Sequence, residues 1–241
     1  MPHSAPTSAG ASRLKLLGLC AACALAVVTA ALYARAFGWE NLFVEGSWAE
    51  IAQQIVWVAG ACWAWWRIPR VAGRDRWMVF WLAVMASLAA AREQDLQKYL
   101  NPKRFGDYGV HFKINWWLDG SVPLWLKAGW ALVGLILVAA VTVPLLRARP
   151  RLVLLTLGLD RAVWLFGAGG ALLVVGYGAD DLFGRGQVMS LTASEVLEET
   201  CELIGALLIV WSIALTARVG LDEREARAKD VLARLRGRRA G

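Results

Sequence analysis

The side chains best suited to chemistry lie in the segment EVLEETCELIGALL, which begins at Glu195. At about 100° per residue along a helix, Glu195, Glu199 and Glu202 point in nearly the same direction, and Glu198 lies beside them. This spacing predicts an acidic stripe about two helical turns long. Crowded carboxylates leave capacity for a bound cation or a proton, because adjacent negative charges are costly until one is neutralised.

Two other segments carry polar residues beside apolar ones. Arg92, Glu93 and Asp95 follow the apolar residues 77–91, and Arg92 and Asp95 are helical neighbours three positions apart. Glu50 and Gln54 lie near the start of the apolar residues 48–66. Arg92 is the expected counter-charge for the acids.

The elements that position these residues are long apolar runs. Of 241 residues, 58% are hydrophobic and 19% are charged, and the mean hydropathy is +0.48. Soluble domains are usually less apolar, at about 45–50%. The runs predict an all-α, polytopic membrane helix bundle of about six transmembrane helices. The predicted spans are residues 16–34, 48–66, 77–91, 122–146, 152–179 and 195–217.

Several spans are too short to cross a bilayer on apolar residues alone. A spanning helix needs about 20 residues, whereas the apolar stretches 77–91 and 203–217 each contain 15. The third span must therefore draw in Arg92 and Glu93, and the sixth must draw in Glu199 and Glu202. An ionised group at the bilayer centre costs about 2.5–3.5 kcal/mol, so these side chains are expected to face the bundle interior.

Orientation follows from the distribution of cations. The two ends and the loops after the second and fourth spans hold 17 of the 26 Lys and Arg residues. The positive-inside rule then predicts both termini in the cytoplasm, with the acidic cluster facing outward. It also accounts for the net charge of +7 without nucleic acid as a partner. The predicted domains are a disordered segment 1–12, a six-span domain 13–217 and a basic tail 218–241.

Local patterns suggest further details. Thr192 and Glu195 form a capping-box pattern at the start of the last span. The third helix is expected to continue as far as Lys98.

Glycines in the fifth span are expected to let another helix approach closely. Asp160 and Arg161 are interpreted as a structural pair, or Arg161 as a snorkelling side chain. Glu195 and Glu198 also suit a solvated helix N-terminus.

The segments LAAAREQDLQKYL, which ends at Leu100, and EVLEETCELIGALL resemble those of a group of uncharacterised bacterial multi-pass inner-membrane proteins. Members of that group carry an Arg-Glu-x-Asp run at the end of a middle helix and a Glu-rich start to the last helix. The resemblance covers the third to sixth spans. It implies the topology and the choice of residues, and it implies no activity.

Three functions remain open on the sequence alone. The first is binding or transport of a cation, a proton or a lipid headgroup, with membrane lipid as a partner. The second is a membrane-embedded lipid-modifying hydrolase that uses carboxylates and His111, and the third is a structural or accessory subunit. Catalytic residues, metal and cofactor are undefined, and a homo-oligomer is left open. The candidate ligand-binding residues are Glu50, Gln54, Arg92, Glu93, Asp95, Glu198, Glu199 and Glu202.

Overall fold

The computed structural model describes residue 25 and residues 27–43, 46–94, 114–150, 160–179 and 191–237. Every regular element within these residues is a helix, which agrees with the predicted all-α class. The long helices are α2 (Trp48–Arg67), α3 (Gly73–Glu93), α6 (Leu124–Ala148), α8 (Arg161–Gly178), α9 (Leu191–Thr216) and α10 (Leu221–Gly237). The short ones are Val27–Phe37, η1 (Trp39–Leu42), η2 (Ile68–Arg70) and α5 (Ile114–Leu118).

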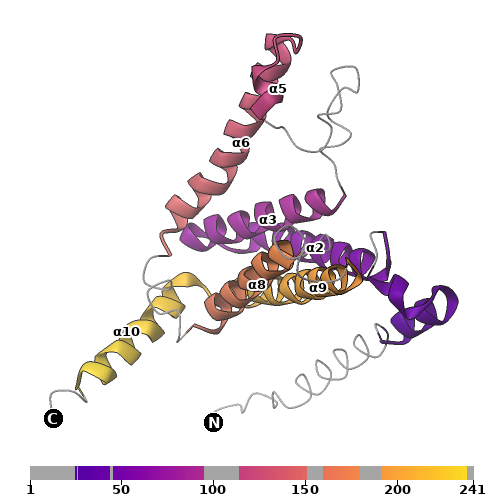
Figure 1. Cartoon of the computed structure of the whole chain (residues 1–241). Coiled ribbons are helices and arrows are strands. Elements are labelled where there is room, and N and C mark those ends of the chain that lie inside the picture. The colour runs from indigo at the N-terminus through magenta and orange to yellow at the C-terminus, as the bar shows by residue number, and fades with distance from the viewer. Residues whose placement is uncertain are drawn as a thin grey trace.

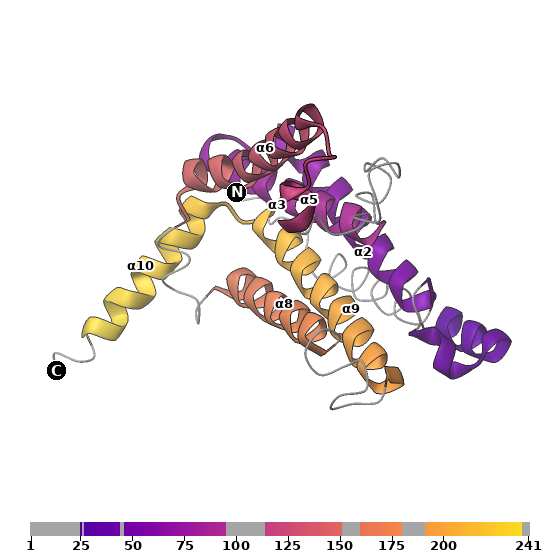
Figure 2. The same ribbon diagram turned by 45° about the horizontal axis from the view of Figure 1, so that its top comes forward.

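Four of the long helices form a bundle. Helix α8 packs along α9, α9 packs along α2, and α2 packs along α3. Figure 2 shows α8 and α9 side by side. Helix α6 packs on α3 and projects away from the other helices, and α10 leaves the bundle at one end (Figure 1). The bundle therefore brings α2 and α3 together with α8 and α9, which come much later in the sequence.

The core of the bundle consists of small residues beside a few large ones. Ala64 of α2, Ala83 and Ala86 of α3 and Ala206 of α9 are fully buried. Such residues let helix backbones approach closely when no hydrophobic force drives association in lipid. Trp57, Leu82 and Ile213 fill the remaining space and are at most 4% exposed.

Two glycines set the distance between α8 and α9. A Cβ added to Gly169 would lie 2.7 Å from the carbonyl oxygen of Gly205, and one added to Gly176 would lie 3.1 Å from that of Glu198. The predicted role in close packing is confirmed at these two positions. It is wrong for Gly167 and Gly170, where a Cβ would meet open space. The close approach at Gly176 places α8 against the acidic part of α9.

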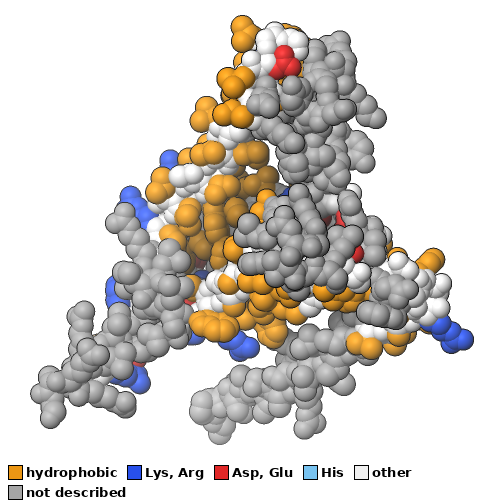
Figure 3. All heavy atoms as spheres, viewed as in Figure 1, with side chains coloured by type: hydrophobic (Ala, Val, Ile, Leu, Met, Phe, Trp, Pro, Cys, Tyr) orange, Lys and Arg blue, Asp and Glu red, His pale blue; other side chains and the backbone are white. Residues whose placement is uncertain are grey.

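Three of the described helices are long and apolar enough to cross a membrane: Leu124–Ala148, Arg161–Gly178 and Thr192–Thr216. Helix α6 exposes large apolar side chains, among them Leu135 and Val138, each more than 60% exposed. Figure 3 shows hydrophobic side chains across the face that α3 and α6 form. Membrane association agrees with the predicted class. Six spans and the placement of the two ends remain predictions.

The helix ends differ from two predictions. Helix α3 ends at Glu93, and the N–H of Gln94 bonds to the carbonyl oxygens of Ala90 and Arg92 in a tight last turn. Gln94 forms a turn, so α3 itself does not extend past Glu93, and the rest of the predicted continuation to Lys98 lies outside the described residues. Helix α9 begins at Leu191, so Thr192 lies in its first turn instead of capping it.

Other predictions concern residues that the structure does not describe. These are the disordered segment 1–12, the first part of the first span, residues 152–159 of the fifth span, Asp95, and the loop that contains His111. Within the predicted basic tail, residues as far as Gly237 form α10.

Candidate functional site

Glu202 is a buried acid in the middle of the bundle. It belongs to α9 and is only 6% exposed. The side-chain Nε2 of Gln53, on α2, donates a hydrogen bond of 3.2 Å to its Oε2. From α3, Nη1 of Arg92 lies 3.5 Å from its Oε1. One carboxylate thus joins three helices, and the prediction that Arg92 is its counter-charge agrees with this geometry.

Arg92 serves two acids at once. The same Nη1 atom lies 3.2 Å from Oε1 of Glu93, the last residue of α3. The side chains of Glu93 and Glu202 are each 8% exposed, whereas that of Arg92 is 57% exposed. Arg92 therefore covers two buried carboxylates from the outside. With all three ionised, the group carries an excess negative charge.

A cavity of about 350 Å³ adjoins these charges, and we call it the Glu202 pocket. Its volume is at the small end of the range of about 300–1,000 Å³ for ligand pockets. Apolar and aromatic side chains of all four bundle helices form its walls, and the charged residues lie together in its lining. The lining residues are Trp57, Met85, Ala89, Arg92, Glu93, Phe166, Leu173, Val174, Tyr177, Glu202 and Ile209.

The Glu202 pocket is open at one side. Val174 and Tyr177, on α8, are 73% and 59% exposed, so this side of the lining belongs to the outer surface of the bundle. That surface is part of an apolar span. In a bilayer an exposed apolar surface of a spanning helix meets acyl chains. The open side of the pocket therefore belongs to the surface of a candidate membrane span.

Some of the buried polar atoms that lack a hydrogen-bond partner lie near Glu202. Within the described residues, these include Oε1 of Gln53, Nε1 of Trp57 and Oε2 of Glu199. Gln53 and Trp57 are 1% and 4% exposed. A buried polar atom without a partner costs about 1–3 kcal/mol, so a concentration of them calls for an explanation. A site that gains partners when it binds a ligand provides one.

The other predicted residues lie around this centre. Glu50 accepts a hydrogen bond from the backbone N–H of Gly46 and so connects the first turn of α2 to the segment that precedes it. Gln54 is half-buried and does not line the pocket. Glu198 and Glu199 precede Glu202 on α9 by about one turn, and both are partly buried. A ligand-binding role for any of the predicted residues stays a prediction.

Gln53 is a member of the cluster that the sequence reasoning missed. The buried face of α2 consists of Ala49, Gln53, Trp57, Gly60, Ala61 and Ala64. These positions recur at intervals of three or four residues, as one helical face requires. This period, applied to residues 48–67, would have placed Gln53 inside the bundle instead of its neighbour Gln54.

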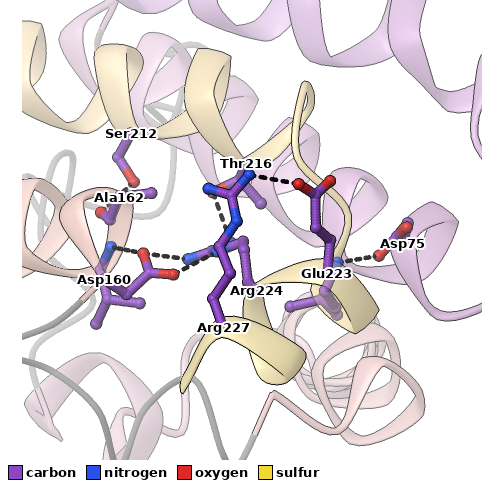
Figure 4. Close-up of polar contacts among 10 residues, drawn as sticks. Asp75, Asp160, Ala162, Ser212, Thr216, Glu223, Arg224 and Arg227 are labelled. Atoms are coloured by element: carbon purple, nitrogen blue, oxygen red, sulfur yellow. Dashed lines mark hydrogen bonds and ion pairs between the residues drawn. The ribbon is translucent and has the colours of Figure 1, made fainter. Parts of the chain in front are cut away.

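A second polar network lies at the other end of the bundle. Arg224 of α10 donates two hydrogen bonds to Asp160, and its Nη1 also contacts Oγ1 of Thr216 (Figure 4). Asp160 caps α8 by accepting the N–H of Val163. Burial alone would raise the pKa of Asp160, but the bonds from Arg224 and Val163 hold it below its ordinary value.

This network corrects the interpretation of Asp160 and Arg161 as a pair. Asp160 pairs with Arg224 instead. The guanidinium of Arg161 lies 5.5 Å from the ring centre of Trp211, a cation–π distance. The reason is geometric: Asp160 turns back onto the first turn of its own helix as an N-cap, and in this position it meets α10.

Within the described ranges, no group of three or more His, Cys, Asp or Glu residues has an arrangement suited to a metal ion. Comparisons with protein-family models, with curated proteins and with solved structures find no match for the chain. The resemblance to a group of bacterial inner-membrane proteins therefore remains a prediction.

Proposed function

We propose that this protein is a multi-pass membrane protein that binds an amphiphilic cation in the Glu202 pocket, as the first step of its storage or transport. The ligand's charged group lies beside Glu202 and Glu93, and its apolar part lies along the aromatic walls. One observation carries the proposal: a mostly apolar cavity is bounded by two buried carboxylates that share a single arginine.

The charge of the cluster favours a cationic ligand. When both carboxylates are ionised, Arg92 neutralises only one of them, and Glu93 and Glu202 have no second cation among their polar contacts in the described residues. A buried charge without a partner costs free energy, so a positive ligand that neutralises it binds with a favourable electrostatic contribution. An anionic ligand would add to the excess.

The walls favour an ammonium group attached to an apolar body. Trp57, Phe166 and Tyr177 line the cavity. Aromatic faces attract quaternary and primary ammonium groups, by about 0.5–2 kcal/mol depending on desolvation. The exposed side of the pocket gives such a molecule a route from the surrounding acyl chains.

The test uses dodecyltrimethylammonium and the purified protein in dodecyl maltoside, a neutral detergent with the same alkyl chain. Calorimetric titration is expected to show saturable binding at one site per chain. Glu202→Gln keeps the size of the side chain and removes its charge, and it should weaken binding about tenfold to a hundredfold, as close charge pairs at interfaces do.

Glu195→Gln is the matched control, since it removes the same charge from the same helix about two turns away from Glu202 and outside the pocket lining. Its affinity should stay within about twofold of the parent. Glu93→Gln provides a second pocket variant in case Glu202→Gln fails to fold. Equal affinity in the parent, Glu202→Gln and Glu93→Gln would overturn the proposal.

A structural role is the second candidate, because the Glu202 cluster connects α2, α3 and α9. Under this alternative, Glu202→Gln and Arg92→Gln lower the thermal stability of the ligand-free protein, and dodecyltrimethylammonium stabilises neither the parent nor the variants. Under the binding proposal, the ligand raises the midpoint of the parent by mass action, raises that of Glu202→Gln less, and still raises that of Arg92→Gln, which keeps both carboxylates. Unfolding with and without the ligand separates the two.

A further inference from the structure

A cluster of arginines surrounds a second cavity, which lies at the end of α6 opposite to α5. This cavity has a volume of about 390 Å³ and is lined by Arg74, Val143, Leu146, Arg147 and Arg149. We call it the Arg147 pocket. In Figure 3, Lys and Arg side chains follow the edge of the molecule beside this end of α6.

Arg74 lines the Arg147 pocket and contacts the end of α6. Its Nε donates to the carbonyl oxygen of Ala148 at 2.9 Å, and its Nη2 donates to that of Arg149 at 2.7 Å. It also forms ion pairs with Glu225 at 2.7 Å and Asp222 at 3.1 Å. Arg74 therefore holds the end of α6 in place, and acids of α10 already compensate its charge.

Arg147 and Arg149 provide charge that is not compensated. Neither forms an ion pair with a carboxylate in the described part of the chain, and both are exposed. The guanidinium of Arg147 lies 5.1 Å from the ring centre of Trp77. Arg149 has a φ of 50° and ends α6 in the left-handed conformation. Two guanidiniums at one cavity favour a phosphate, which they bind through charge-assisted hydrogen bonds.

The aliphatic residues of the pocket indicate which kind of phosphate-containing molecule it binds. Val143 and Leu146 are 45% and 65% exposed, and they lie on the last two turns of a helix apolar enough to cross a membrane. Val143 and Arg147 are four residues apart and share one helix face. In a bilayer this arrangement places the guanidiniums at headgroup depth and the aliphatic groups beside the first carbons of an acyl chain.

We infer that the Arg147 pocket binds the phosphodiester headgroup of an anionic phospholipid. Basic pockets at the ends of membrane spans bind such headgroups, and each cation near the surface contributes to the attraction. The inference is independent of the proposed ligand of the Glu202 pocket, since the two cavities share no lining residue.

Native mass spectrometry of the detergent-purified full chain, mixed with phosphatidylglycerol or with phosphatidylcholine, tests the inference. The parent should retain phosphatidylglycerol in preference to phosphatidylcholine. Arg147→Gln with Arg149→Gln should weaken the binding of phosphatidylglycerol about 30-fold, which is about 2 kcal/mol at about 1.4 kcal/mol per factor of ten. Both side chains are exposed, so the double variant should fold normally.

Arg70→Gln with Arg76→Gln is the control, because it removes two exposed cations outside the pocket lining, one from the connection between α2 and α3 and one from the first turn of α3. It should change the affinity less than threefold. An equal loss in both double variants would assign the effect to total charge and overturn the inference. So would displacement of the lipid by millimolar glycerol 3-phosphate, which would make a soluble phosphate the ligand. Retention of the lipid, together with weaker binding by Val143→Ala with Leu146→Ala, would support it.

Discussion

Arg224 and Asp160 are 64 positions apart in the sequence, and they form a bidentate ion pair at one end of the bundle. Nε of Arg224 lies 2.6 Å from Oδ2 of Asp160, and Nη2 lies 2.7 Å from Oδ1. Arg224 is only 7% exposed, which is rare for an arginine on an otherwise charged helix. The pair therefore fixes α10 to the start of α8.

Removal of one partner of this pair should destabilise the protein. Arg224→Gln leaves the Asp160 carboxylate buried without its cation, and loss of one partner of a buried pair costs about 3–5 kcal/mol. The unfolding free energy in mild detergent, followed by circular dichroism, measures the loss. Arg227→Gln is the control, because the contact of Arg227 with Glu223 is exposed on both sides and should contribute less than about 1 kcal/mol.

Acid should release α10 from the bundle. The bond from Arg74 lowers the pKa of Glu225, and the bonds from Arg224 and Val163 lower that of Asp160 against the effect of burial. A carboxylate with a lowered folded-state pKa contributes stability above its unfolded-state pKa, and this contribution is lost as the pH falls through the folded-state value. The losses begin near the ordinary values of 4.5 for Glu225 and 3.8 for Asp160.

Limited proteolysis between pH 6 and pH 2.5 with pepsin, which is active over the lower part of this range, measures that release. Cleavage within α10 should begin below about pH 4 in the parent. In Asp160→Asn, which lacks the titrating group, it should occur at every pH at which pepsin is active. Resistance of α10 in the parent down to pH 2.5 would contradict the prediction.

The helices were predictable to the extent that apolar runs define them. Residues 48–66 and 122–146 match α2 and α6 within two positions. The end of α3 was not predictable in this way, because Arg92 and Glu93 belong to a run that favours helix well beyond the point where α3 stops. Tertiary contacts, which local patterns do not contain, decide such ends.

The acidic centre could be anticipated because charge within an apolar run is expensive. This argument led to Glu202 and Arg92, which the structure brings together. It could not identify Arg224, since α10 contains four other cations with the same local surroundings, and only the fold shows which one meets Asp160. A long-range ion pair leaves no periodic signal along a single sequence.

Glycine substitutions on α8 should differ sharply according to the face they occupy. Gly169→Ala places a methyl group 2.7 Å from the Gly205 carbonyl oxygen, so α8 and α9 must separate, at a cost of about 1–3 kcal/mol. Gly170→Ala meets open space and should be neutral or slightly stabilising, because alanine favours the helix by up to about 1 kcal/mol. Thermal unfolding of the two variants tests the contrast, and equal midpoints would disprove the close contact.

The predicted six-span topology places the arginine-rich end of the bundle in the cytoplasm and the start of α6 outside. Three single-cysteine variants test it in a background in which the four natural cysteines are replaced by alanine: Arg76→Cys, Gly120→Cys and Lys229→Cys. The three positions are exposed, so each thiol should react with a reagent that reaches it. In intact spheroplasts, a maleimide that cannot cross the membrane should label Gly120→Cys alone. After permeabilisation, all three should react, because the other two then become accessible.

Labelling of Arg76→Cys in intact cells would reverse the predicted orientation. Labelling of Arg76→Cys and Gly120→Cys together would show that α6 does not span the membrane as a single helix between these two sides.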